Sequence, residues 1–241
     1  MGAKKSVDIV IPVYYKEALH LEKRLLEQIG YYKKTLKNYR WRIIVANNGP
    51  KKDVLPVVRE FMKKHKMVLY TDIDTPGRGI ALRHTWLNSI SDFLLYMDAD
   101  LATSLDSLMP MLTLLENHCD MAIGSRYVPG ARAKRTLSRL ILSKVYNLLL
   151  HVLLGLDITD SQCGFKGIRR DVARKVIPHV EDEWWFFDTE MLYVAKKMGY
   201  TVCEIPVEWY EQNETSVQLI TVSLDYLKNI FRLCFTKHVY P

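Results

Sequence analysis

The chain has 241 residues, of which 49% are hydrophobic and 25% are charged, and its formal net charge is +7. This composition excludes a disordered or low-complexity chain and is typical of a folded α/β domain with a sizeable core. The positive charge favours anionic partners such as a nucleotide, a phosphate or a membrane surface.

The first half of the chain alternates short apolar runs with segments whose apolar residues recur at helical spacing. We predict strands over 7–11, 41–46, 67–71, 93–97 and 121–124, and helices over 18–37, 54–65, 80–90 and 105–117. This alternation predicts a doubly wound, mostly parallel sheet with helices on both faces.

Two carboxylates follow the apolar run over 93–97, in the sequence Asp98-Ala99-Asp100. Ligands of open α/β sheets bind just beyond the carboxyl ends of the strands. Two aspartates at this position could hold one hard cation, Mg²⁺ or Mn²⁺, shared with a substrate phosphate. A strand followed by an Asp-capped turn is the alternative, and this motif alone does not decide between them.

Other polar segments also follow predicted strands, and each is compatible with a simple turn. Pro12, Tyr14 and Glu17 could hold a base and a ribose, although Glu17 could merely favour a helix N-terminus. Asn47 opens an Asn-Asn-Gly turn. Arg78 lies in a Gly-rich segment where backbone N–H groups and a guanidinium could approach a diphosphate. No glycine triplet follows the first strand, which argues against a dinucleotide-binding dehydrogenase.

The second half contains a basic segment joined to an apolar helix. Between residues 121 and 156 the chain has basic residues but no acidic one, and a helix over 137–156 becomes apolar almost all round. This combination indicates an interfacial element facing anionic lipid headgroups, with a core helix that has a basic end as the alternative. No stretch reaches the ~18–20 uninterrupted apolar residues of a spanning helix, so we expect peripheral attachment.

The remaining segments complete the domain. We predict a short strand after the loop over 159–167, a helix over 171–177 capped by Asp171, a helix over 188–199 and a strand over 201–207. Asp188 follows an acidic and aromatic loop, where it could be a general base or could simply stabilise a helix start. We therefore expect a catalytic domain over 1–215 and an amphipathic helix within 216–241 that contacts a membrane or a partner chain in a homodimer.

The cysteines form no CxxC pair, so a structural zinc site is not expected. Free thiols in a reducing compartment are the simplest interpretation of Cys119, Cys163, Cys203 and Cys234. The N-terminus shows no signal-peptide core. We therefore expect a cytoplasmic protein on the cytoplasmic face of a membrane.

In combination, these segments resemble the inverting family-two glycosyltransferases of the GT-A fold, over about residues 7–209. Residues 12–17 are similar to the nucleotide-binding segment of that family, 47–53 to its Asp-Asp-Gly-Ser turn, 76–83 to its Gly-Lys-Gly segment and 98–100 to its metal-binding DxD. The resemblance implies a nucleotide-sugar site and Mg²⁺ or Mn²⁺ on Asp98 and Asp100. The implied nucleotide-sugar-binding residues are Pro12, Tyr14, Glu17, Asn47, Arg78, Asp98, Ala99 and Asp100. Asn47 replaces the aspartate that usually contacts the base.

Within this family the chain is most similar to dolichyl-phosphate sugar synthases. Residues 160–166 resemble the Asp-Thr-Gln-Cys-Gly-Phe-Lys segment of the glucosyltransferase branch, and 187–192 resemble its Phe-Asp-Val-Glu-Leu-Leu. Ala102 stands where the mannosyltransferase branch tends to carry a glutamine ligand. By similarity, Arg126, Arg139 and Ser143 would hold the acceptor phosphate.

The resemblance implies metal-dependent transfer of a hexose, glucose from UDP-glucose, to a polyprenyl or dolichyl phosphate with inversion. GDP-mannose is the alternative donor, and a glycan hydroxyl is the alternative acceptor. The implied catalytic residues are Asp98, Asp100 and Asp188; only a hydroxyl acceptor would need Asp188 as a base. Nucleic acid is not an expected partner, because the basic residues adjoin an apolar helix and not aromatic stacking platforms.

Overall fold

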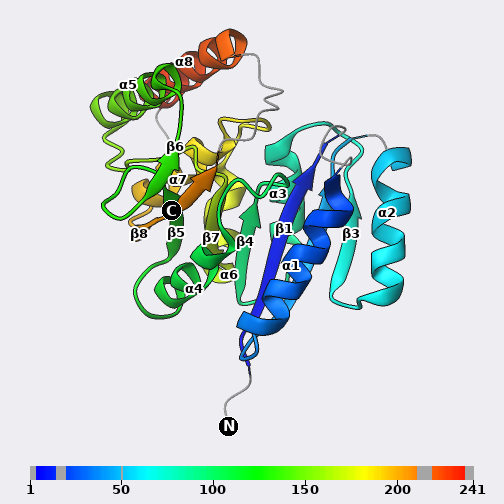
Figure 1. Ribbon diagram of the computed structural model, residues 1–241. Helices are drawn as coiled ribbons and strands as arrows, with labels where there is room; N and C mark the ends of the chain where they lie inside the picture. Colours follow the sequence, from blue (N-terminus) through cyan, green and yellow to red (C-terminus); the bar gives the residue numbers. More distant parts are fainter. Residues whose placement is uncertain (1–3, 15–19, 50, 211–218, 237–241) are drawn as a thin grey trace.

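The computed structural model describes residues 4–14, 20–49, 51–210 and 219–236, with only the backbone given for 51–53 and 219–223. Its centre is a seven-stranded sheet in the order β3-β2-β1-β4-β7-β5-β8, in which only β7 runs antiparallel to its neighbours (Figure 1). The strands are β1 Ser6–Val13, β2 Arg40–Asn47, β3 Val68–Asp72, β4 Phe93–Met97, β5 Met121–Ser125, β7 Phe165–Arg169 and β8 Val202–Pro206. The prediction of a mostly parallel α/β sheet is thus confirmed.

Alternate residues of the strands bury opposite faces of this sheet, as in a covered parallel sheet. One face packs on α1, α2 and α4, and the other packs on α3, α6 and α7. The α-helices are α1 Leu21–Thr35, α2 Lys51–Lys64, α3 Arg78–Leu87, α4 Leu108–Asn117, α5 Leu137–Leu154, α6 Arg170–Val176, α7 Phe187–Lys197 and α8 Leu219–Phe235. Asp171 lies in the first turn of α6 and does not cap it, because the N-cap is Arg169.

The helices α5 and α8 lie together at one end of the molecule, beyond the carboxyl ends of the parallel strands (Figure 1). Beneath them, β6 Arg132–Lys134 and β9 Glu208–Tyr210 form a small separate sheet. The first described residue of the C-terminal helix is Leu219, so the start of the segment over 216–241, where we predict this helix, lies outside the described residues.

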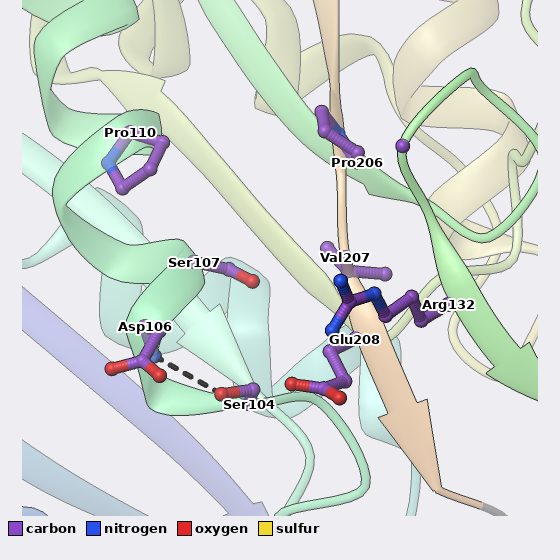
Figure 2. A pocket seen from close by; sticks show the side chains of 9 residues that line it. Ser104, Asp106, Ser107, Pro110, Arg132, Pro206, Val207 and Glu208 are labelled. Atoms are coloured by element: carbon purple, nitrogen blue, oxygen red, sulfur yellow. Dashed lines mark hydrogen bonds between the residues drawn. The ribbon is translucent and has the colours of Figure 1, made fainter.

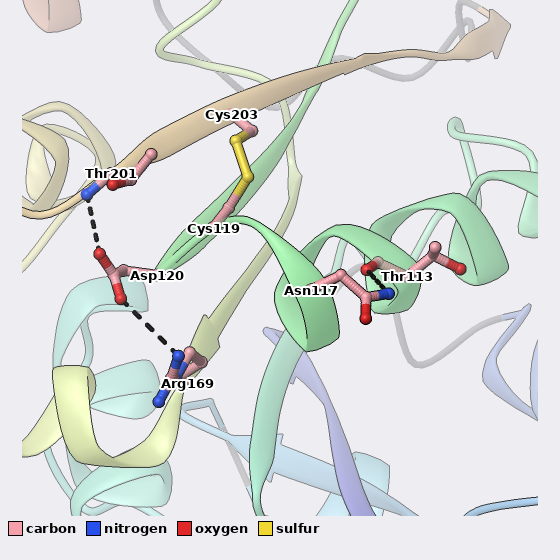
Figure 3. The surroundings of a disulfide bond; sticks show 7 residues. All are labelled: Thr113, Asn117, Cys119, Asp120, Arg169, Thr201 and Cys203. Atoms are coloured by element: carbon pink, nitrogen blue, oxygen red, sulfur yellow. Dashed lines mark hydrogen bonds and ion pairs between the residues drawn. A yellow bond between two sulfur atoms is a disulfide. The ribbon is translucent and has the colours of Figure 1, made fainter.

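Two cysteines form a disulfide, which corrects the prediction of four free thiols. Cys119 and Cys203 are bonded with their Cα atoms 6.1 Å apart, whereas Cys163 and Cys234 are free. The disulfide joins the residues preceding β5 to the edge strand β8 (Figure 3). The sequence did not predict this pair because the two cysteines are 84 residues apart and meet only through the parallel pairing of β5 with β8.

Helix α5 also corrects an expectation. Its 18 residues have a mean hydropathy of 1.4, which makes it long and apolar enough to cross a membrane by length and composition, contrary to the prediction from uninterrupted apolar runs. Core helices of soluble proteins can meet the same criterion, and 28% of this helix is buried in the protein.

Candidate active site

The predicted carboxylates lie where β4 ends. The Asp98 backbone N–H donates to the carbonyl oxygen of Gly164 at 3.0 Å, and Asp100 Oδ1 accepts from the Ala102 N–H at 2.9 Å. Directly after Asp100 the chain turns through Leu101, whose φ of 54° lies in the left-handed region. A bulky residue rarely adopts this conformation outside functional turns. The turn places both carboxylates, each half-buried, at the carboxyl edge of the sheet.

Gly164 is required for this arrangement because it lies directly against Asp98. A Cβ atom built on Gly164 would come within 1.6 Å of Asp98 Oδ2 and 2.7 Å of Oδ1. No side chain fits there, so the glycine permits the close approach of two backbone segments.

Arg78 connects the two ends of the carboxylate cluster. Its Nη2 lies 3.1 Å from Asp98 Oδ1 and 3.2 Å from Asp188 Oδ2, and it also donates to the Tyr96 hydroxyl at 2.9 Å. The guanidinium lies 5.0 Å from the ring centroid of Trp185. The backbone after Arg78 is held by the segment preceding α7, because the N–H groups of Gly79 and Ile80 donate to the Glu183 carbonyl.

Asp188, in the first turn of α7, is buried and ion-paired on both oxygens. Oδ1 lies 3.0 Å from Lys166 Nζ and accepts from the Tyr96 hydroxyl, and Oδ2 faces Arg78. Burial alone would raise the pKa of Asp188, but the Lys166 and Arg78 charges outweigh it and hold the pKa below its usual range. The sequence brought Asp188 to attention but not its partner Lys166, which is fully buried.

The environment of Asp98 raises the pKa of its carboxyl group, in contrast to the lowered pKa of Asp188. Its side chain keeps 40% of its surface exposed, yet dense protein atoms surround it. Desolvation raises the pKa of Asp98 to about 6, Arg78 opposes this rise, and the Asp100 and Asp188 charges add to it. A proton or a cation on this carboxylate is therefore favoured over an isolated negative charge.

The capacity of the site to bind a metal ion rests on Asp98 and Asp100. Among the residues that the structure describes, no three His, Cys, Asp or Glu side chains gather as a ligand group. Mg²⁺ and Mn²⁺ favour oxygen donors, and Mg²⁺ commonly takes one or two carboxylates and completes its shell with water and substrate phosphates. The donor set of Asp98 and Asp100 fits such a cation.

The predicted base-binding residues lie at the neighbouring strand ends. The Asn47 amide is buried at the end of β2, where it donates to the Tyr70 hydroxyl at 3.1 Å and to Asp72 Oδ1 at 3.2 Å. Pro12 lies in β1, and Tyr14 just after it is 50% exposed. Glu17 lies outside the described residues. Asp72, which ends β3 and pairs in register with Asn47, was not predicted from the sequence as a site residue.

A second cluster lies beside the start of α5. Arg126 donates to both oxygens of the fully buried Asp160, Nε at 2.7 Å and Nη2 at 2.8 Å. Ser143 is buried on α5 and accepts from Arg135 at 2.9 Å. Arg139, one turn before Ser143, is half-buried. The predicted acceptor residues thus gather in one region, together with an arginine that the sequence analysis did not single out.

One heptapeptide, residues 160–166, links the two clusters. Asp160 holds Arg126, Ser161 donates to the Asn147 side chain of α5, and the Cys163 carbonyl accepts from Lys166 Nζ at 2.6 Å. Lys166 in turn pairs with Asp188. The similarity of this heptapeptide to a family motif therefore has a structural basis, because almost every position holds part of the site.

Helix α8 packs against α5 and α7 beside the candidate active site. The Tyr226 ring packs 5.1 Å from the ring centroid of Tyr146 on α5, and the Tyr146 hydroxyl lies 2.7 Å from Thr189 Oγ1, next to Asp188. Arg232 Nη2 pairs at 2.9 Å with the fully buried Glu190. These contacts fix α8 against α7.

The outer faces of α5 and α8 expose apolar side chains. These apolar side chains point away from the sheet, whereas Ser143, Asn147 and Leu150 of α5 face inward. The exposed residues are Leu137, Ile141, Leu142, Val145, Leu148, Val152, Leu153, Leu224, Leu227, Phe231 and Phe235. We call this set the apolar face.

A hollow of about 260 Å³ lies between α4 and β9 (Figure 2). It is lined by Ser104, Asp106, Ser107, Pro110, Gly130, Arg132, Pro206, Val207 and Glu208. None of the clustered site residues lines it, so it is separate from the candidate active site. At its wall the Ser104 N–H donates to the Glu208 carbonyl at 2.9 Å and ties the segment after β4 to β9.

Comparison with known proteins identifies relatives along most of the chain. Residues 8–177 match the family described as Glycosyl transferase family 2. The glycosyltransferase AglD of Haloferax volcanii is 32% identical over an alignment of 242 residues that covers 100% of this chain and 39% of AglD. The dolichyl-phosphate beta-glucosyltransferase ALG5C of Trichomonas vaginalis is 30% identical over an alignment of 222 residues that covers 87% of this chain and 65% of ALG5C. The chain therefore spans less than two thirds of either relative.

The fold has relatives among solved structures. Glucosyl-3-phosphoglycerate synthase from Mycobacterium tuberculosis, solved with Mn²⁺, UDP and glucosyl-3-phosphoglycerate, aligns with a TM-score of 0.72 over 97% of this chain and 81% of that chain. The sequences are only 12% identical, so this likeness concerns the fold alone. It confirms the predicted GT-A architecture.

Proposed function

The chain belongs to glycosyl transferase family 2, and from this premise we propose that it transfers glucose from UDP-glucose to a polyprenyl or dolichyl phosphate. The reaction proceeds with inversion and depends on a divalent cation. Relatives named as dolichyl-phosphate beta-glucosyltransferases support this substrate pair. Mannose transfer from GDP-mannose is the alternative within the same chemistry.

The lowered pKa of Asp188 favours a phosphate over a sugar hydroxyl as the acceptor. A sugar hydroxyl needs a general base, and a useful base has a pKa near the working pH. Asp188 is bound by Lys166, Arg78 and Tyr96, and its pKa is lowered, so it is a poor proton acceptor. A phosphate monoester is already ionised near neutral pH, with a second pKa near ~6, and needs positioning more than deprotonation.

Asp98 and Asp100 are the residues that would hold Mg²⁺ or Mn²⁺. When bound, the cation would offset the negative charge that develops on the leaving diphosphate. The Arg78 guanidinium, fixed between Asp98 and Asp188, is placed to donate to donor phosphates at the same edge. Asp188 and Tyr96 orient this guanidinium, which gives Asp188 a role in catalysis without proton transfer.

The remaining assignments concern substrate binding. Pro12, Tyr14, Glu17 and Asn47 would surround the nucleoside, and Ala99 would border the donor beside the carboxylates. Arg126, Arg139 and Ser143 would hold the acceptor phosphate below the apolar face. Arg126 and Ser143 lie in one region, because Arg135 donates to Ser143 and shares the ring of Trp209 with Arg126, which supports this placement.

We propose that the apolar face attaches the protein to the cytoplasmic face of a membrane, where a lipid phosphate would enter between α5 and the sheet. The basic residues around the start of α5, including Arg139 and Lys144, favour anionic headgroups. A homodimer through α8 is the competing use of the same surface, although the inward side of α8 is already occupied by α5 and α7.

The test is transfer by the purified protein of labelled glucose from UDP-glucose to a short-chain polyprenyl phosphate with Mn²⁺. We expect transfer with UDP-glucose, none after chelation with EDTA, and a loss of at least ~10²-fold for Asp100→Ala. Full activity of Asp100→Ala would overturn the metal assignment. Transfer of mannose from GDP-mannose in place of glucose would select the alternative donor. Transfer to glycan hydroxyls alone would overturn the acceptor.

A further inference from the structure

The loop before α7 packs directly on the glycine-rich segment that carries Arg78. The Glu183 carbonyl accepts from the backbone N–H groups of Gly79 and Ile80 at 2.9 and 3.3 Å. A Cβ atom on Gly77 would lie 2.6 Å from the Glu183 carbonyl oxygen, and one on Gly79 would lie 2.9 Å from the carbonyl carbon. The two glycines therefore allow the loop and the segment to touch through their backbones.

The carboxylate of Asp182 fixes the shape of this loop. Its Oδ1 accepts from the backbone N–H groups of Trp184 and Phe187, both at 2.8 Å. The Asp182 N–H donates in turn to the fully buried Glu190 at 2.8 Å. The backbone that carries Trp184 and Trp185 is thus fixed before any ligand binds, which is favourable for a residue that contacts a ligand.

Trp185 lies against the cationic group of the candidate active site. The guanidinium carbon of Arg78 is 5.0 Å from the Trp185 ring centroid, and the same guanidinium pairs with Asp98 and Asp188. Trp185 still keeps 36% of its surface exposed. A single exposed aromatic residue is common on protein surfaces, but this indole is carried by a fixed loop and borders the arginine proposed to bind the donor phosphates.

The position of Trp185 indicates which part of a nucleotide sugar it would contact. Asn47, proposed to contact the nucleoside, ends β2 on one side of β4. Asp188, which follows Trp185 at the start of α7, pairs with Lys166 of β7 on the other side of β4. A diphosphate bound at Arg78 and at the end of β4, with its nucleoside towards β2, would carry its hexose towards Trp185.

The chemistry of an indole suits a hexose. A pyranose ring has C–H groups on its faces and hydroxyl groups on its rim. An aromatic face carries partial negative charge and attracts such C–H groups. Aromatic side chains beside a few polar groups are typical of small-molecule sites, and the polar groups beside Trp185 are Arg78, Asp98 and Asp188.

We infer that Trp185 is a specificity-determining residue that packs against the hexose of the nucleotide-sugar donor. This inference rests on the proposed function, because it names the residue that contacts the transferred sugar. Arg78 binds the donor diphosphate, and Trp185 binds the sugar attached to it. Loss of the indole should therefore weaken binding of the nucleotide sugar and spare binding of the nucleotide alone.

The test compares UDP-glucose with UDP, which share the nucleotide and differ in the hexose. Binding to the full chain is measured by calorimetry with Mn²⁺ and without acceptor. Trp185→Ala should weaken UDP-glucose binding by about 5- to 20-fold, as expected for a lost aromatic contact and its buried area. It should leave UDP binding unchanged, which also shows that the variant is folded.

Matched variants separate a sugar contact from other effects of the substitution. Trp184→Ala removes the neighbouring indole, which is 50% exposed, and should bind both ligands like the wild-type protein. Trp185→Phe should recover most of the UDP-glucose affinity, because it keeps an aromatic face. In transfer assays Trp185→Ala should raise the KM for the donor and leave the KM for the acceptor unchanged.

Three results would overturn the inference. An equal loss of UDP and UDP-glucose binding in Trp185→Ala would mean that the indole only orients Arg78. A raised KM for the acceptor alone would assign Trp185 to the acceptor. An unchanged affinity of Trp185→Ala for UDP-glucose would exclude a contact with the sugar.

The outcomes also separate this inference from the proposed function. If the wild-type protein binds GDP-mannose in place of UDP-glucose, and Trp185→Ala weakens binding of GDP-mannose but not of GDP, the proposed donor is wrong and the inference stands. If Trp185→Ala binds UDP-glucose normally while the wild-type protein transfers glucose to polyprenyl phosphate, the inference is wrong and the proposed function stands. A wild-type protein that binds neither nucleotide sugar would overturn both.

Discussion

Gly164 shows how a residue without a side chain can control the candidate metal site. A methyl group at this position would overlap the Asp98 carboxylate. We predict that Gly164→Ala displaces Asp98 and lowers transfer activity by at least ~10²-fold, since small displacements in an active site have effects of this size. Gly30→Ala is the matched control, because nothing lies within 4 Å of its added Cβ in helix α1. Equal activity of the two variants would contradict the assigned contact.

The buried pair of Asp188 and Lys166 makes a prediction about stability. Asp188→Asn leaves the buried ammonium of Lys166 without a full charge partner, which should lower the free energy of unfolding by roughly 3–5 kcal/mol at neutral pH. Urea denaturation measures this change. Asp157→Asn, at a side chain that is 89% exposed, should have no comparable effect.

The difference in unfolding free energy between wild type and Asp188→Asn depends on pH because the pKa of Asp188 is lowered. The folded pKa lies below the unfolded value near ~3.9, so the charge of Asp188 stabilises the protein fully above that value. The contribution is lost as the pH falls through the folded pKa. The gap between wild type and Asp188→Asn should therefore narrow in acid, and a gap that widens in acid would contradict the ion pairing.

Among individual residues, sequence reasoning identified those in short motifs and missed those defined by tertiary contacts. Asp98, Asp188 and Arg78 follow strands or open helices, where side chains from separate segments meet. Lys166 lies in the heptapeptide over 160–166 and Arg135 in the basic segment, but the sequence does not show which side chains they contact. Their importance depends on which carboxylate or hydroxyl the fold brings to them.

At the scale of elements, the disulfide fastens the edge strand β8 to the start of β5. Glu204, next to Cys203, supports the Thr159–Asp160 turn, so β8 also reaches the acceptor region. We predict that reduction, or Cys119→Ser, lowers the free energy of unfolding by roughly 2–5 kcal/mol, because the bond closes a long loop in the unfolded chain. Thermal melting with and without reductant measures this loss.

Cys234→Ser is the control for the disulfide prediction, since Cys234 is free and exposed. It should melt like the wild-type protein in the absence of reductant. If reductant shifts the wild-type melting temperature no more than it shifts that of Cys119→Ser, the bond contributes no stability.

The elements themselves were largely predictable because strand and helix have different apolar periods. The parallel strands and most helices lie within a few residues of their predicted ranges. The insertion of β7 between β4 and β5 was not predictable from the same pattern. A short apolar run gives no information about strand direction, and the position of β7 depends on long-range pairing.

For the whole molecule, the apolar face and the candidate active site lie at the same end. Helix α5 contributes Ser143 and Asn147 to the interior and Val145, Leu148 and Val152 to the outside. One helix thus borders both the proposed phosphate site and the proposed lipid surface. The phosphate headgroup of a lipid acceptor at the proposed phosphate site would then lie only the thickness of α5 away from the proposed lipid surface.

This geometry predicts binding to anionic vesicles at low salt, measured by co-flotation. Leu148→Glu with Phe231→Glu should weaken binding by at least ~10-fold, because each apolar side chain contributes roughly 1.5–3 kcal/mol when buried and each new carboxylate repels anionic lipid. Ile90→Glu is the matched control: Ile90 is 70% exposed and precedes β4 at the opposite end of the sheet.

Because α5 joins the lipid surface to Ser143, the double variant should also lose transfer to long-chain polyprenyl phosphate in vesicles while keeping transfer to a short soluble acceptor. Equal loss with both acceptors would mean that the substitutions damage the site, and undiminished flotation would assign the apolar face to a protein partner.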